Sequence, residues 1–316
     1  MTFTDRRRHA NHSATLSHSL VKDFTSYEKI NYILSLTLSL SFILRKPPPA
    51  IIFIINNNMV SNNNKCCLIN VDLQKDFITG SLAVKDGEAV IPIINRLTRH
   101  GPFNLVVYSL DYHPINHISF IDNIHLYARS RRQVRKQQQH HYKTELVTEI
   151  PPYGTIHQQL WPRHCVQGTD GARLWPSLYI KPTAIFVHKG TESAIETYSV
   201  FGNAKMNYTT GLDELLQTAG VTDVYFTGLA EDVCVGESAL DAIQLGYNVT
   251  VIQDATCGVK HTDCDGMRQR IEQHGGHYET SYSVLNRLLQ QSPISSSTSS
   301  FTATTTTSHS AETQSE

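Results

Sequence analysis

Short apolar runs alternate with amphipathic segments over most of the chain. The apolar runs predict buried strands at 66–73 (CCLINVDL), 103–111 (FNLVVYSLD), 183–190 (TAIFVHKG), 223–229 (DVYFTGL) and 248–255 (NVTVIQDA). Helical spacing predicts helices at 87–100, 211–220, 231–246 and 263–275. Strands that alternate with helices predict an open, doubly wound, mainly parallel α/β sheet with helices on both faces.

The periodic segments lie within residues 62–291, which we expect to form one domain. We expect 1–61 to lie outside this fold, either as a disordered extension or because translation starts at Met59. Its apolar run 30–44 (INYILSLTLSLSFIL) is shorter than the about 20 residues that a membrane span needs, so neither membrane insertion nor secretion is expected. The Ser/Thr-rich tail 292–316 is predicted to be disordered.

One segment interrupts the alternation, a basic, Gln-rich insertion near 126–150. Such charge runs are typical of solvated surface loops, although a site for an anionic partner is an alternative. The formal net charge of the chain is -1, which gives no overall field that would favour nucleic acid or a membrane surface. We therefore expect neither of these partners.

The chain has 316 residues, of which 40% are hydrophobic, enough for a sizeable core. Its six cysteines are scattered and show no zinc-ribbon spacing. Reduced thiols are typical of a cytosolic enzyme, so we expect a cytoplasmic protein, with the nucleus as a further compartment. The oligomeric state stays open, a homo-oligomer included.

Reactive side chains follow the ends of several predicted strands. Asp72 follows the first strand, Lys189 ends the third, and Cys234 lies where the fourth strand leads into a helix. Parallel strands bring these positions to one edge of the sheet, where ligands bind in such folds. A thiol beside a cation and a helix N-terminus is expected to have a lowered pKa, with Asp72 as its proton acceptor. Burial of Cys234 as a small apolar side chain is the alternative.

A carboxylate and several imidazoles form a second candidate group. Asp111 and His113 follow the second strand, and His164 lies in LWPRHCVQGT. These residue types are suited to Zn²⁺, Mn²⁺ or Fe²⁺ with positions left open for water or substrate. His117 is a weaker candidate, because it could instead hold its loop by a hydrogen bond to the backbone.

Five ordered blocks resemble the nicotinamidases of the isochorismatase-like cysteine hydrolase superfamily. They are INVDLQKDFITGSLAV, LDYHPINHISF, LWPRHCVQGTDGA, HKGTESAIETYSVF and GLAEDVCVGESALDA. The resemblance implies hydrolysis of nicotinamide to nicotinate and ammonia, in NAD salvage, through a thioester on Cys234 with Asp72 and Lys189. It also implies a divalent metal, zinc with manganese or iron as alternatives, on Asp111, His113 and His164, with His117 ranked lower.

The same resemblance implies finer features of the site. The Leu229–Ala230 peptide bond would be cis, and the N–H groups of Ala230 and Cys234 would form an oxyanion hole. Phe77 and Trp161 would form aromatic walls, although ordinary packing is an alternative for Phe77. Glu231 departs from the family pattern, in which many members have Thr or Ser. Other amide or ureido hydrolases of the superfamily, and a non-catalytic or membrane-tethered relative, remain as alternatives.

Overall fold

The computed structural model describes residues 65–128, 134–136 and 144–291. The two terminal segments, for which we expect no part in the fold, lie outside the described residues. A sheet of six strands forms the centre, in the order β11-β10-β9-β1-β2-β6, and all of its neighbouring strands pair in parallel. The strands are β1 (Lys65–Val71), β2 (Leu105–Asp111), β6 (Ile185–Lys189), β9 (Val221–Leu229), β10 (Asn248–Cys257) and β11 (His277–Glu279). The predicted fold class is confirmed.

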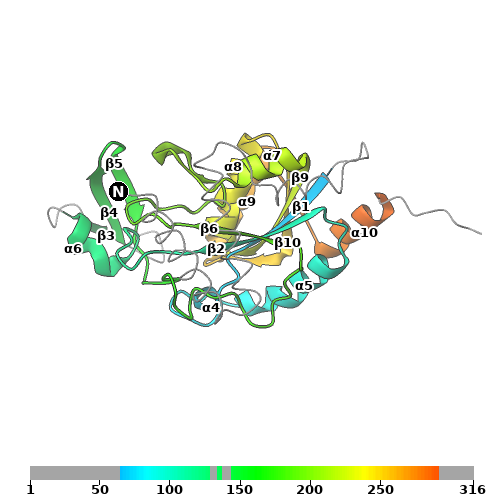
Figure 1. Ribbon diagram of the computed structural model, residues 1–316, viewed down its shortest axis with the longest axis horizontal. Helices are drawn as coiled ribbons and strands as arrows, with labels where there is room; N and C mark the ends of the chain where they lie inside the picture. The colour runs from blue at the N-terminus through cyan, green and yellow to red at the C-terminus, as the bar shows by residue number, and fades with distance from the viewer. Residues whose placement is uncertain (1–64, 129–133, 137–143, 292–316) are drawn as a thin grey trace, which may run out of the picture.

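Helices cover both faces of this sheet (Figure 1). One face carries α4 (Lys75–Ile78), α5 (Ile91–His100) and α10 (Ser281–Gln291), and the other carries α7 (Leu212–Ala219), α8 (Gly236–Gln244) and α9 (His261–Gln273). Successive residues of β1 point to opposite faces, so Leu68 belongs to the core under α5 and Ile69 to the core under α8. This double burial explains why the strands are continuous apolar runs.

A small antiparallel sheet lies at one end of the domain, beside α6 (Ile124–Tyr127) (Figure 1). It consists of β3 (Val134–Lys136), β4 (Thr144–Ile150) and β5 (Gly154–Gln159). The expected surface loop is therefore wrong for 144–150. Leu146 on β4 is fully buried against Ile118 and Leu160, and this short apolar contact was hidden by the basic residues before it.

The remaining elements are short turns and bridges. They include 3-10 turns at Gly87–Val90, Ile121–Asn123 and Ala204–Met206, the strands β7 (Gly202–Asn203) and β8 (Tyr208–Thr209), and a π-helical turn at Glu231–Val235. The helix predicted for 231–246 thus divides into this π-helical turn and α8. In the part of the chain that the structure describes, no helix is long and apolar enough to cross a membrane.

Candidate active site

The carboxyl ends of β1, β2, β6 and β9 converge, and the candidate reactive groups meet there. The ammonium group of Lys189 lies 2.9 Å from Asp72 Oδ2 and 3.4 Å from Cys234 Sγ. We call Asp72, Lys189 and Cys234 the thiol side of the site. All of these side chains are buried, so their charges interact with little screening by water.

Lys189 also forms a close ion pair with Asp111 Oδ1. Burial lowers the pKa of Lys189, but Asp111 and Asp72 raise it, and the net pKa lies well above its ordinary value. Burial raises the pKa of Asp111, yet Lys189 and His113 lower it, and the net pKa lies well below its usual range. Each of these two side chains therefore favours the charged form of the other.

The thiol of Cys234 behaves differently from the sequence-based expectation. Burial raises its pKa well above the ordinary value, and the lowering effect of Lys189 is smaller. Burial also raises the pKa of Asp72, against the lowering effect of Lys189. The expected lowered pKa of the thiol is thus wrong, because burial outweighs the effect of Lys189. A carboxylate with a raised pKa next to the thiol is well suited to accept the thiol proton.

Residues that sequence reasoning missed hold the carboxylates in place. The Ser109 hydroxyl donates to Asp72 Oδ1 over 2.6 Å, which leaves Oδ2 to face Lys189. Gln74 accepts a hydrogen bond from the backbone of Asp111 (2.8 Å) and donates one to its carbonyl (2.7 Å). The available signal was a polar residue inside a buried strand, Ser109 in LVVYSLD. Asp72 itself has a left-handed backbone (φ 50°), which turns the chain at the end of β1.

The candidate metal ligands meet on the opposite side of Asp111. One ligand atom each of Asp111, His113 and His164 lie within 4.8 Å of one another. Asp111 Oδ2 is 3.4 Å from His113 Nε2 and 3.7 Å from His164 Nε2. We call these residues the metal side of the site.

The metal side fits a divalent cation. His113 Nδ1 donates to the carbonyl of Gly190 (2.9 Å) and His164 Nδ1 donates to the carbonyl of Pro162 (2.7 Å). A carbonyl only accepts, so in the neutral ring Nδ1 carries the proton and Nε2 keeps its lone pair. His113 Nε2 is buried without a hydrogen-bond partner. Gly190 permits this approach, because a Cβ atom there would lie 2.3 Å from the His113 ring.

His117 lies outside this group of ligands. Its Nδ1 is 2.7 Å from the Ser119 hydroxyl and its Nε2 is 3.2 Å from the carbonyl of Ile195. Burial lowers the pKa of His117 to about 4, so the ring is neutral and holds its loop.

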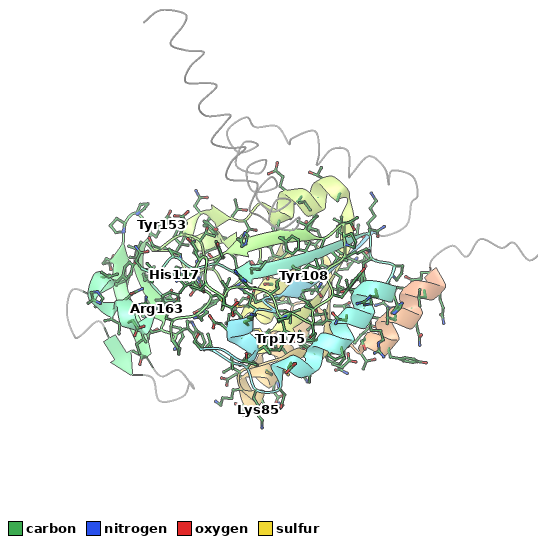
Figure 2. The ribbon with its side chains drawn as sticks, turned by 60° about the horizontal axis from the view of Figure 1, so that its bottom comes forward. Lys85, Tyr108, His117, Tyr153, Arg163 and Trp175 are labelled. Carbon is green, nitrogen blue, oxygen red and sulfur yellow. The ribbon has the colours of Figure 1, made fainter. Side chains whose placement is uncertain are left out.

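Figure 2 shows His117 between the central sheet and the small sheet. A second group of potential ligands joins His117 to His113 and to Glu196, a buried residue to which sequence reasoning gave no role.

A pocket that is partly open to solvent connects both sides of the site. Cys234 and Ala230 line it together with Asp111 and His164, and its apolar walls include Phe77 and Trp161. The rings of Phe77 and His164 lie 5.4 Å apart, and Trp161 Nε1 donates to the Tyr198 hydroxyl over 2.9 Å. The lining of the pocket therefore suits a flat aromatic ring between a thiol and a metal-binding group. Tyr198 was also missed from the sequence.

The turn that carries Cys234 begins directly after β9. The Leu229–Ala230 peptide bond is cis, as the resemblance implies. The carbonyl of Ala230 accepts hydrogen bonds from the N–H groups of Val233 (3.0 Å) and Val235 (3.1 Å). These bonds close a π-helical turn around the cysteine, so the backbone of Ala230 and the position of Cys234 are fixed together.

This combination of a parallel α/β sheet and a buried Cys–Lys–Asp group defines a class of cysteine-dependent enzymes. The chain belongs to the isochorismatase family, because the family model described as Isochorismatase domain matches residues 66–282 of its sequence. A nicotinamidase from Acinetobacter baylyi is 38% identical over 207 residues, which cover 65% of this chain and 86% of the relative.

Solved structures show the same likeness. A pyrazinamidase of Pyrococcus horikoshii in complex with zinc is 30% identical with a TM-score of 0.52, and the match covers 68% of this chain and 99% of that chain. The yeast nicotinamidase bound to the inhibitor nicotinaldehyde is 28% identical with a TM-score of 0.60, again over 68% of this chain and 99% of that chain.

Proposed function

We propose that this protein is a nicotinamidase, which hydrolyses nicotinamide to nicotinate and ammonia in NAD salvage. The observation that carries the proposal is a pocket in which Asp111 links two groups, since one of its oxygens faces Lys189 and the other faces two imidazoles. An amide attached to an aromatic ring needs both a nucleophile for its carbonyl carbon and a means of orienting the ring. Nicotinamidase relatives support the same substrate.

In the first half of the reaction, Cys234 attacks the amide carbon of nicotinamide while Asp72 takes the thiol proton. Lys189 stabilises the negative charge that develops on sulfur, 3.4 Å away. The N–H groups of Ala230 and Cys234 donate to the carbonyl oxygen as it becomes negative. Asp72 then gives its proton to the amine, the C–N bond breaks, and ammonia leaves a thioester on Cys234.

In the second half, water replaces ammonia next to Asp72. The carboxylate removes a proton from this water, whose oxygen attacks the thioester carbon. The C–S bond breaks, the sulfur recovers a proton from Asp72, and the product leaves as nicotinic acid, which gives its remaining proton to the solvent and becomes nicotinate. In each half of the reaction, Asp72 thus accepts one proton and gives one back, a role that its raised pKa favours.

Ring recognition depends on the other walls of the pocket. Phe77 and Trp161 pack against the faces of the pyridine ring. Asp111, His113 and His164 would hold a divalent metal, which we propose to be zinc, and when bound it supplies a Lewis acid for the ring nitrogen. With the metal bound, these residues would set the place of the ring nitrogen relative to Cys234 and so favour a carboxamide at one ring position.

Parallel assays of ammonia release test this proposal. The zinc-loaded full chain is expected to release ammonia and nicotinate from nicotinamide in equal amounts, and to leave an aliphatic N-carbamoyl amine unchanged. The second substrate represents the other amide and ureido hydrolases of the superfamily. Turnover of the N-carbamoyl amine without turnover of nicotinamide would overturn the proposal.

A further inference from the structure

A buried carboxylate stands at the start of the turn that carries the nucleophile. Glu231 follows Ala230 directly, and its side chain is only 3% exposed. Ala230, Val233 and Cys234 line the pocket, whereas the Glu231 side chain extends toward α9 and β10. It therefore lies behind the reacting groups and does not contact a substrate in that pocket.

Arg268 on α9 holds this carboxylate at two points. Arg268 Nε lies 2.7 Å from Glu231 Oε1, and Arg268 Nη2 lies 3.2 Å from Oε2. A two-point guanidinium–carboxylate contact fixes direction as well as distance. The Thr256 hydroxyl on β10 donates to Oε2 over 3.4 Å, and the guanidinium lies over the ring of Tyr278, 5.4 Å from its centre.

The next residue fixes the turn from a second direction. The carboxylate of Asp232 accepts hydrogen bonds from the N–H groups of Val259 (2.9 Å) and Lys260 (3.1 Å), just before α9. Asp232 therefore attaches the turn to the backbone of the β10–α9 connection, whereas Glu231 attaches it to a side chain. Without Arg268, the long contact from Thr256 (3.4 Å) would be left to hold the Glu231 side chain, and the first residue of the turn could rotate about the attachment at Asp232.

Stability alone does not account for the Glu231–Arg268 pair. Glu231 is buried, but the Arg268 side chain is 39% exposed. Such an ion pair adds little to stability over well-packed apolar residues, because burying the carboxylate costs free energy and water screens the guanidinium. It does specify one geometry, and here that geometry belongs to the turn whose Ala230 carbonyl closes onto Val233 and Val235. A rotation at Glu231 would tilt the adjoining N–H of Ala230 and shift Cys234.

We propose that Glu231 and Arg268 are positioning residues that hold the nucleophile turn in its reactive orientation. The inference rests on the proposed amide hydrolysis. By holding the turn, the pair keeps the N–H groups of Ala230 and Cys234 aligned. This alignment matters in the transition state, when the carbonyl oxygen of the substrate carries negative charge. Loss of the pair should lower kcat and leave KM nearly unchanged. The aromatic walls that bind the ring, Phe77 and Trp161, lie outside the turn and do not depend on Glu231.

The variant Arg268→Lys tests the two-point contact, because it keeps the charge but not the fork of donors. We expect kcat for nicotinamide to fall about tenfold, a fraction of the loss seen when an oxyanion donor is removed outright. KM should stay within about twofold and the melting temperature within about 5 °C. Affinity for nicotinaldehyde, which forms a tetrahedral adduct with a thiol, should fall in parallel with kcat, whereas affinity for nicotinate should not.

A matched control lies on the same helix. Arg270 on α9 forms an exposed ion pair with Glu237 on α8, over 3.2 Å. Arg270→Lys should leave kcat and nicotinaldehyde affinity within about twofold, because exposed pairs contribute little. If Arg268→Lys does not fold, the double variant Glu231→Gln/Arg268→Gln replaces the ion pair by two amides that can still bond to each other. It should fold and show the same fall in kcat.

The outcomes separate this inference from the proposed function. If the wild-type chain hydrolyses nicotinamide and kcat falls tenfold in Arg268→Lys, or in the double variant, the result supports the positioning role. Wild-type turnover with unchanged kcat in either folded variant overturns that role and leaves nicotinamide hydrolysis standing. A wild-type chain that releases no ammonia overturns the proposed function, and the inference with it.

Discussion

The thiol side and the metal side of the pocket are built in different ways. Asp72 and Lys189 come directly from ends of parallel strands, and Cys234 follows another strand end by a single turn. Ion pairs between buried full charges hold this side together. On the metal side, His164 comes from a loop next to the small sheet, and carbonyl groups hold the imidazoles through their Nδ1 atoms.

The difference shows what each side depends on. The thiol side depends on the register of the central sheet and on a balance of buried charges. The metal side depends on packing between the central sheet and the small sheet, which lets a loop bring His164 to Asp111. Asp111 is the one residue that belongs to both, because Oδ1 faces Lys189 and Oδ2 faces the imidazoles. Variants on each side should therefore have separable effects, and a variant of Asp111 should combine them.

The largest effect is expected for Cys234→Ala, which removes the nucleophile. Hydrolysis of nicotinamide should fall by at least about 10⁴-fold, with the fold and metal content preserved. Steady-state ammonia release and elemental analysis of the purified variant measure this. Cys257→Ala changes a half-buried thiol outside the pocket and should retain turnover. Substantial turnover by Cys234→Ala would remove the covalent mechanism.

Asp111→Asn should damage both sides at once. Turnover should fall about 10³-fold, metal should be lost, and the free energy of unfolding should drop by about 3 kcal/mol because Lys189 loses a buried partner. Activity, metal content and denaturant unfolding of the same preparation give the comparison. Asp170→Asn, at an exposed ion pair with Lys75, is the control and should change none of them. Normal metal content in Asp111→Asn would contradict the shared role.

His164→Ala should affect the metal side alone. We expect turnover to fall about 100-fold together with metal content. The thermal midpoint should change less than in Asp111→Asn, because His164 has no ion pair with Lys189, although its ring also contacts Phe77 and lies near Asp111. His157→Ala on β5 is the control, since its ring pairs with Glu145 away from the pocket. Retained metal with retained turnover in His164→Ala would exclude it as a ligand.

The smallest effect on activity is expected for Leu146→Ala in the small sheet. The lost packing against Ile118 and Leu160 should cost about 2–4 kcal/mol of unfolding free energy. Turnover at saturating nicotinamide should stay within about threefold, while KM rises, because the metal side loosens more than the thiol side. The exposed Leu126→Ala provides the control. A collapse of kcat at unchanged KM would show that the small sheet supports the thiol side instead.

The sequence predicted most of the central sheet and the residues of the thiol side. Continuous apolar runs are the direct result of burial on both faces of a parallel sheet, and strand ends share one edge, so Asp72 and Lys189 could be placed together. The raised pKa of Cys234 could not be predicted. It results mainly from the depth at which the thiol is buried, and the order of residues along the chain does not reveal that depth.

The small sheet, β11 and α10 were not predicted. β11 has three residues, too few for a periodic signal, while the basic run before β4 masked the alternation of Leu146 and Thr148. Helix α10 had a usable signal, since Val284 and Leu288 lie four residues apart on one face. Ser109, Gln74 and Tyr198 were missed because their roles arise from contacts between distant segments.

The most direct test of the account is the partitioning of an acyl-enzyme. The zinc-loaded full chain would be supplied with nicotinamide well below KM and with increasing hydroxylamine. We predict that nicotinohydroxamate replaces nicotinate in proportion to hydroxylamine, while the rate of ammonia release stays constant, because ammonia leaves before the added nucleophile acts. Ammonia release that rises with hydroxylamine, or a product that remains nicotinate alone, would contradict a thioester on Cys234.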